Sequence, residues 1–302
     1  MMNQHRAPEV LVVGEALVDI VRSGEGDVEH VGGSPANVAL GLGRQGVAVA
    51  LLTRIGDDAR GRSIREHVAA AGVDVLAAST TADPTSTAVA TIGADGSADY
   101  EFDIRWDIDP SATPATARIV HTGSIAAFLE PGAGRVRELI ARAGDAIVTF
   151  DPNIRPALLG ERDDAVRTFE SIVPLCTIVK MSDEDAAWLY PGAAVTEVLD
   201  RLLCLGAEAG SITRGGDGAI LASARGAVEV PGVAVAAVDT IGAGDTFMAS
   251  LIHSALRDGI PSTPEQLATA GGRAARAAAI TVSRAGADLP WSRELDGPFE
   301  AS

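Results

Sequence analysis

Short apolar runs that alternate with helical stretches limit the fold of this 302-residue chain more than any other feature. Strands are expected at 10–13 (VLVV), within 47–57 (VAVALLTRIGD), and at 147–151, 177–181 and 211–213. Helices are expected at 35–44, 61–71, 135–142, 164–173 and 196–205. This alternation predicts a doubly wound α/β fold, in which a mostly parallel sheet is covered by helices on both faces.

One region breaks the alternation. Residues 85–92 (TSTAVATI) and 99–106 (DYEFDIRW) are extended segments joined by the turn-forming GADGSA, which predicts a β-hairpin. The strand near 17–21 and the segment VEHV before Gly32 are expected to join it. A small sheet inserted in this way makes a natural lid over a substrate cleft. We therefore assign residues 1–16, 32–84 and 109–302 to an α/β core and residues 17–31 and 85–108 to a β-sheet lid.

Charge and composition exclude several classes of protein. The formal net charge of −17 repels polyphosphates at long range, so nucleic acids and anionic membranes are not expected as partners. No apolar run approaches the ~18 residues that a membrane span needs, and the first residues, MMNQHRAPEV, do not resemble a signal peptide. A cytoplasmic location is expected. Cys176 and Cys204 lie in apolar segments and are expected to be buried free thiols.

Two common nucleotide-binding motifs are excluded. Lys180 is the only lysine, and it does not follow the paired glycines that a Walker-type phosphate loop requires. The GxGxxG pattern at Gly41–Gly46 falls within or at the end of a predicted helix, whereas a dinucleotide fingerprint must join a strand to a helix. A tight helix–sheet contact and a C-terminal glycine explain that pattern better. Metal-ligand spacing of histidines, GxSxG and local Cys–His pairs are absent from the sequence.

The strongest chemical signal is DTIGAGD, residues 239–245, which is followed by the apolar helical stretch TFMASLIHSAL. A small-residue loop before a helix N-terminus binds anions, because unpaired N–H groups and the helix dipole point at the same place. Asp245 is expected in the first turn, ionised and able to accept a proton from a hydroxyl. The alternative is that Asp245 is only an N-cap. The preceding GAG and the second aspartate, Asp239, favour the catalytic interpretation.

A second glycine-rich segment is GGSPAN, residues 32–37. Paired glycines let a ligand approach the backbone closely, and Asn37 offers both a donor and an acceptor that suit a polyol. A simple helix-capping turn explains this segment equally well, so both interpretations stay open.

Together, the two motifs resemble the signatures of the ribokinase-type (pfkB) carbohydrate kinases. The first signature fits from GGSPAN to Gly56-Asp57, and the second fits DTIGAGDTF, with Ser250 where glycine or alanine is commoner. The resemblance implies a ribokinase-like α/β sandwich with a small β-sheet lid, and ATP-dependent phosphorylation of a sugar hydroxyl with Mg²⁺ and K⁺. An open strand edge on the lid would favour a homodimer.

The resemblance also implies roles for individual residues. Asp245 resembles the base, and the backbone N–H groups of Gly242, Ala243 and Gly244 resemble the anion hole for the transferred phosphoryl group. Sugar contacts fall on Asp19, Gly33 and Asn37, and contacts to the ATP phosphates and ribose fall on Thr213, Gly216 and Gly218. The adenine wall falls on 274–282 and the following RAGA, which would form a monovalent-cation site with Asp239. The family's N-x-x-E motif, which organises Mg²⁺ through water, falls on Ser182 and Asp185, and both depart from the common form.

The segment FDPNIRP, with Arg155, resembles the element through which fructokinases and 2-keto-3-deoxygluconate kinases reach the sugar. HTGSIA and KMSDEDAAWLYPG are more similar to fructokinases. Fructose is therefore the expected substrate, with 2-keto-3-deoxygluconate, ribose or a nucleoside as alternatives. Arg155 has the alternative of being a surface arginine after a strand. A non-catalytic sugar- or nucleotide-binding regulator on the same fold is disfavoured, because a regulator has no need of the Asp245 base.

Overall fold

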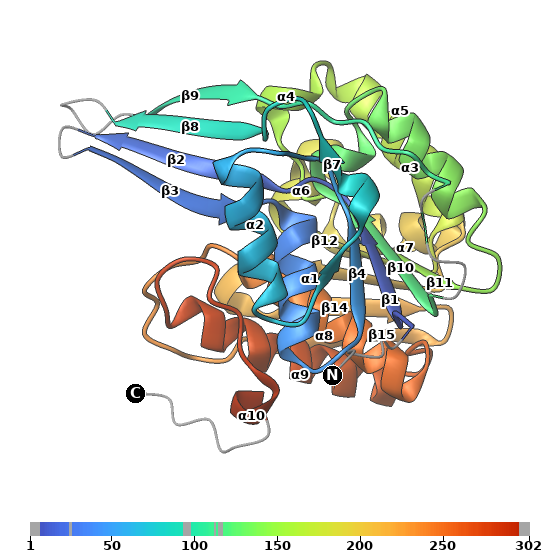
Figure 1. The fold of residues 1–302 in the computed structure, drawn as a ribbon. Coiled ribbons are helices and arrows are strands. Elements are labelled where there is room, and N and C mark those ends of the chain that lie inside the picture. Colours follow the sequence, from blue (N-terminus) through green and yellow to red (C-terminus); the bar gives the residue numbers. More distant parts are fainter. Residues whose placement is uncertain (1–6, 24–25, 93–97, 112, 114–116, 296–302) are drawn as a thin grey trace.

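The computed structural model describes residues 7–23, 26–92, 98–111, 113 and 117–295 (Figure 1). Its main body is a nine-stranded sheet with the order β15-β14-β13-β12-β11-β10-β1-β4-β6. The strands are β1 (Val10–Val13), β4 (Val49–Leu52), β6 (Asp74–Val75), β10 (Ile119–Gly123), β11 (Ile147–Asp151), β12 (Ile178–Ser182), β13 (Ala209–Thr213), β14 (Ala219–Ser223) and β15 (Gly226–Val230). Pairing is parallel from β6 to β13, whereas β14 and β15 pair antiparallel at that edge.

Helices cover both faces of this sheet (Figure 1). One face carries α1 (Ser34–Arg44), α2 (Ala59–Ala69), α8 (Ala243–Asp258) and α9 (Pro264–Val282), and the other carries α3 (Gly132–Ala141), α5 (Arg162–Ile172), α6 (Asp183–Leu189) and α7 (Val195–Leu205). Each face has its own hydrophobic cluster, and β1 contributes to both. Val10 and Val12 point into the first cluster and Leu11 and Val13 into the second. Strands that are apolar on both faces are typical of buried parallel sheets, and the predicted doubly wound fold is confirmed.

A separate four-stranded sheet, with the order β3-β2-β8-β9, extends from this body (Figure 1). Its strands are β2 (Leu17–Ser23), β3 (Gly26–Gly32), β8 (Thr87–Ile92) and β9 (Ala98–Asp103). β8 and β9 pair antiparallel, as the predicted hairpin requires, while β2 pairs with β3 and β8. Most of the connecting turn, 93–97, lies outside the described residues. The remaining elements are short: β5 (Ile55–Gly56), β7 (Thr80–Thr81), α4 (Pro156–Leu159), α10 (Ser292–Leu295) and the 3₁₀ turns η1 (Ala77–Ser79), η2 (Ser124–Ala127), η3 (Val173–Leu175) and η4 (Gly215–Asp217).

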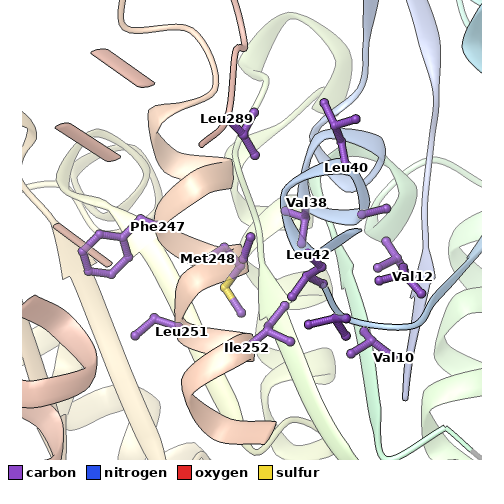
Figure 2. Close-up of a cluster of buried hydrophobic side chains, with 14 of the residues drawn as sticks. Val10, Val12, Val38, Leu40, Leu42, Phe247, Met248, Leu251, Ile252 and Leu289 are labelled. Carbon is purple, nitrogen blue, oxygen red and sulfur yellow. The ribbon is translucent and has the colours of Figure 1, made fainter. Parts of the chain in front are cut away.

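The helices α1 and α8 run side by side in the same direction, and their apolar side chains meet above β1 (Figure 2). A Cβ atom at Gly41 would lie 3.1 Å from Ala249 Cβ and 2.5 Å from Leu289 Cδ2, so the missing side chain lets α1 approach α8. Gly41 and Gly43 therefore serve packing, and Gly46 adopts a left-handed φ of 84° just after α1, as expected of a C-terminal glycine. The contact at Gly41, however, is between helices and not between helix and sheet. Because the two helices are parallel, their N-termini lie at the same end of the molecule.

The two cysteines differ in exposure. Cys176 is buried as predicted, whereas Cys204 is exposed on α7, so its predicted burial is wrong. Its neighbours Leu199 and Leu202 occupy the buried side of this amphipathic helix, which leaves Cys204 on the solvent side. Among the helices of the described residues, none is both long and apolar enough to span a bilayer.

Candidate active site

The order of the strands reverses between β1 and β10, so the carboxyl ends of these two strands are the expected ligand-binding edge of the sheet. From β1 the chain proceeds through β4 to β6 on one side, then returns to build β10 to β13 on the other. Open α/β sheets bind ligands where the strand order reverses in this way. Glu15 follows β1 there, and its Oε2 accepts a hydrogen bond from the Ala126 N–H, 3.1 Å away, at the end of β10. The small sheet also starts there, at Leu17.

Asp245 lies at the junction between the two parallel helices. It is the third residue of α8 and only 6% exposed. Ser34 Oγ donates to its Oδ1 at 2.6 Å, and Asn37 Nδ2 donates to its Oδ2 at 2.8 Å. The N-cap of α8 is Gly242, so the alternative that Asp245 is merely the N-cap is wrong. The two glycine-rich motifs therefore meet at one carboxylate.

The loop before α8 turns sharply at Gly242, whose φ of 78° is in the left-handed region. Of the three N–H groups predicted to bind the phosphoryl group, that of Ala243 also donates to Thr240 O at 3.2 Å. Asp239 accepts hydrogen bonds from the N–H groups of Ile241 and Gly286, at 3.0 and 2.9 Å. These two bonds hold the pKa of Asp239 below its usual range, so its carboxylate stays ionised. The same bonds join this loop to the RAGA segment.

Asp19 projects from β2 beside Gly32. A Cβ atom at Gly32 would lie 2.0 Å from Asp19 Oδ2, so a larger residue there would displace this carboxylate. Although Asp19 is exposed, partial desolvation raises its pKa, while the nearby charges of Arg155 and His30 act in the opposite direction. Asp19 and Arg155, predicted as sugar contacts, are thus close enough for their charges to interact. Gly33, with φ 104°, brings α1 against the backbone of Glu15, because a Cβ there would lie 2.6 Å from Glu15 O.

The loop that carries Arg155 is fixed by Asp185 at the start of α6. Asp185 Oδ1 accepts from the Ile154 N–H at 2.8 Å, and its Oδ2 accepts from the Ser182 N–H at 3.0 Å. Ser182 Oγ in turn accepts from the Asp185 N–H, which completes a capping box. Arg155 Nη1 donates to Asn153 Oδ1 at 2.7 Å. Asp185 therefore positions the arginine loop, a role that the sequence did not reveal.

The three residues predicted to hold ATP follow β13. Thr213 is its last residue and donates through Oγ1 to Met181 O at 3.4 Å, and Gly216 is exposed in η4. Gly218 is buried, and a Cβ there would lie 2.1 Å from Val230 O. Gly218 thus closes the loop against β15, while Thr213 and Gly216 remain at the carboxyl edge of the sheet.

Two buried charged residues in this region were not predicted. Burial raises the pKa of Glu15 to about 7, although hydrogen bonds from Ser124 and Ala126 lower it. Lys180 is 3% exposed in β12, and its Nζ lies 2.8 Å from Asp151 Oδ2. The signal available in the sequence was a charged residue within an apolar run, EVLVVGEALV for Glu15 and TIVKMS for Lys180. Within the described residues, no cluster of three His, Cys, Asp or Glu side chains suits a metal ion.

Known proteins resemble this chain in both sequence and overall structure. The sequence profile of the pfkB family of carbohydrate kinases matches residues 7–294. A fructokinase from Klebsiella pneumoniae is 33% identical over 301 residues, which cover 95% of this chain and 98% of that protein. Aminoimidazole riboside kinase from Salmonella enterica, solved with aminoimidazole riboside and an ATP analogue, has a TM-score of 0.82 at 27% identity and covers 95% of this chain and 98% of its own. A fructokinase double mutant from Vibrio cholerae O395, solved with fructose, ADP and a potassium ion, has a TM-score of 0.83 at 25% identity, covering 97% and 98%.

Proposed function

Because the chain belongs to the pfkB family of carbohydrate kinases, we propose that it transfers the γ-phosphoryl group of ATP to a hydroxyl of fructose. The observation that carries this proposal is the carboxylate of Asp245, held by Ser34 and Asn37 at the N-terminus of α8. A base and an anion-binding helix terminus at the same point are what a phosphoryl transfer to a hydroxyl requires. The similarity to curated fructokinases supports fructose as the acceptor.

In the proposed reaction the sugar lies between Asp19 and Arg155 on one side and Asp245 on the other. Asp245 accepts the proton of the attacking hydroxyl. The N–H groups at Gly242, Ala243 and Gly244 bind the phosphoryl oxygens, and most of the rate enhancement comes from positioning and electrostatics. Asn37 donates a hydrogen bond to Asp245 Oδ2. The rest of its amide group adds a hydrogen bond to the sugar.

The charges around Arg155 favour a neutral sugar over a sugar acid. The charge of Arg155 acts on the carboxyl group of Asp19 and more weakly on that of Glu15. An arginine that already interacts with Asp19 gains less from a substrate carboxylate, which would also meet repulsion from Asp19. This arrangement supports fructose over 2-keto-3-deoxygluconate. Because the chain is similar to aminoimidazole riboside kinase, a riboside is the second candidate substrate.

ATP would lie along the carboxyl edge of β13, between Thr213 and Gly216. Mg²⁺ usually binds through one or two carboxylates, water and substrate phosphates, so the lack of a protein cage in the described residues is compatible with it. Asp185 has lone pairs left after its two backbone bonds and would hold a water of the hydrated ion. Asp239 and the RAGA segment would bind K⁺, which is the ion present with the Vibrio fructokinase.

We also propose that the protein is located in the cytoplasm, where ATP is available. There it is proposed to form a homodimer through the small sheet. Val21, Val28, Tyr100 and Phe102 are exposed, and the strand registers place them on one face, which also carries Asp19. Tyr100 and Phe102 stack with ring centroids 6.2 Å apart. A flat apolar sheet face suits a second copy of itself. Sedimentation of the wild type and of a Tyr100→Asp variant tests this, and a monomeric wild type would contradict it.

The decisive experiment for the activity follows ADP release from MgATP with fructose, in the wild type and in Asp245→Asn. The wild type should turn over. The variant should lose ~10²–10⁴-fold in kcat, the usual contribution of a positioned base, while still binding fructose and ATP. A variant with near-normal kcat would remove Asp245 from the role of base. A wild type that phosphorylates a riboside faster than fructose would overturn the choice of sugar.

A further inference from the structure

The ammonium group of Lys180 lies directly behind the loop that is expected to bind the phosphoryl group. A Cβ atom built on Gly244 would lie 3.0 Å from Lys180 Nζ. Glycine at this position thus leaves space for a cation as well as for a ligand. Lys180 comes from the middle of β12, whereas Gly244 is the second residue of α8, so tertiary packing alone brings the two together.

Three carboxylates surround this cation. Asp151 accepts its hydrogen bond at 2.8 Å, and the charges of Asp151, Asp185 and Asp245 all act on Lys180. Burial alone would lower the pKa of Lys180, but the attraction of these carboxylates raises it, so the side chain stays charged. On its other side, burial and the charge of Lys180 lower the pKa of His121 to about 3, which keeps that ring neutral. Lys180 is therefore the cation that offsets the carboxylates around Asp245.

Stability does not explain this ion pair well. A buried pair costs so much desolvation that well-packed apolar residues of similar size often stabilise a protein equally or better. The pair is also incompletely satisfied, because among the described residues Asp151 Oδ1 finds no hydrogen-bond partner. A buried oxygen without a partner weakens the case that this ion pair is there for stability.

We propose that Lys180 is a positioning residue for phosphoryl transfer, whose charge behind Gly244 offsets the carboxylates that the anionic phosphoryl group must approach. This inference rests on the proposed function and extends it. In the transfer, the sugar oxygen forms a bond to the γ-phosphorus, and the bond from that phosphorus to the bridging oxygen of ADP breaks. The hydroxyl proton passes to Asp245. Negative charge thus moves past three carboxylates, and a fixed cation lowers the barrier more than it strengthens substrate binding.

The test compares two variants that share the same change at Asp151. Asp151→Asn keeps the cation, and Lys180 still interacts with the charges of Asp185 and Asp245, whereas the double variant Asp151→Asn/Lys180→Met removes the cation without leaving Asp151 as an unpaired buried carboxylate. We expect kcat with MgATP and fructose to be ~10²–10³-fold lower in the double variant than in Asp151→Asn, the range for loss of one transition-state donor. The KM values for fructose and ATP should change by no more than about threefold between the two. Equal kcat values in the two variants would overturn the proposal, because Lys180 would then serve only to neutralise Asp151.

Because the sequence contains one lysine, a second readout is available. Untagged protein labelled with ¹³Cε-lysine gives a single lysine resonance, which is absent from the double variant. This resonance should shift when fructose, MgADP and aluminium fluoride are added together, beyond its shift with MgADP alone. A resonance that does not move would contradict the proposal. Wild type and Asp245→Asn are assayed in parallel, so that a failure of the kinase activity itself is distinguished from a failure of the role of Lys180.

Discussion

Asn37 and Asp245 are separated by 208 residues in the sequence, yet Asn37 Nδ2 lies 2.8 Å from Asp245 Oδ2. Further along the same two helices, Gly41 faces Ala249, and His253 Nδ1 lies 2.8 Å from Gln45 Oε1. The parallel packing of α1 on α8 therefore sets the geometry at Asp245. Changes at the side chains that join the two helices near Asp245 should affect turnover even where no substrate is touched.

Ser34→Ala tests this relationship at the other oxygen of Asp245. Loss of a hydrogen bond to a charged group costs about 1.5–3 kcal/mol, so kcat/KM should fall roughly 10- to 150-fold. The matched control is Ser254→Ala, the same substitution in a buried serine near the far end of α8, which should keep near-wild-type kcat/KM. If Ser34→Ala behaves like this control, the hydroxyl does not orient the carboxylate.

Arg155→Ala should reduce kcat/KM for the preferred sugar by about 1.5–3 kcal/mol, because a charged hydrogen bond to the sugar is lost. The assay compares fructose, ribose, adenosine and 2-keto-3-deoxygluconate in the wild type and the variant. Arg142→Ala removes an exposed arginine paired with Glu138 and serves as the control. An unchanged substrate profile in Arg155→Ala would show that Arg155 is a surface arginine that does not contact the sugar.

Activity should require Mg²⁺ and be higher in K⁺ than in Na⁺ or choline salts. Asp239→Asn should weaken the preference for K⁺, because it removes the charge that joins the anion-binding loop to the RAGA segment. Initial rates at constant ionic strength measure the effect. Equal rates of the wild type in all three salts would exclude a functional monovalent-cation site.

The small sheet should close over bound sugar. Its strands β8 and β9 form a hairpin at one edge of the four-stranded sheet, outside the main body, where a substrate can order it. Amide hydrogen exchange in β8 and β9 should slow when fructose is added, while exchange in β10 and β11, which lie inside the main sheet, should stay constant. The same protection of the hairpin with and without fructose would show that the sheet does not close.

Glu15 should make stability depend on pH in a predictable direction. Its pKa is raised from 4.5 to about 7, so the folded state retains a proton that the unfolded state loses. The stabilisation from this proton is complete below pH 4.5 and disappears as the pH rises through about 7. Glu15→Gln should therefore match the wild type near pH 4.5 and exceed it above pH 7 by on the order of 3 kcal/mol, at about 1.4 kcal/mol per pKa unit. Urea unfolding of both proteins across this pH range measures the difference, and a constant difference would contradict the raised pKa.

The sequence alone determined the fold class, because the spacing of hydrophobic residues and the glycines at the ends of elements are local properties of the chain. The runs VLVV and IVTFD became β1 and β11 with the predicted bounds, and DTIGAGD began a helix with Asp245 in its first turn. It also identified the family, since both motifs are continuous in the chain. The Cys204 prediction failed because apolar neighbours in sequence do not show which side of a helix faces solvent.

Only the tertiary structure decided which groups meet. Asn37 was predicted to contact the sugar, and the segment 32–37 to be a ligand site or a capping turn, whereas the packing of α1 on α8 brings the side chains of both Ser34 and Asn37 to Asp245. In the sequence, the position of Lys180 only excluded a Walker-type phosphate loop. Its place beside Asp151 and behind Gly244 follows from the folding of the sheet. Electrostatic interactions depend on distance through space and on burial, and neither is encoded in the local pattern of the residues concerned.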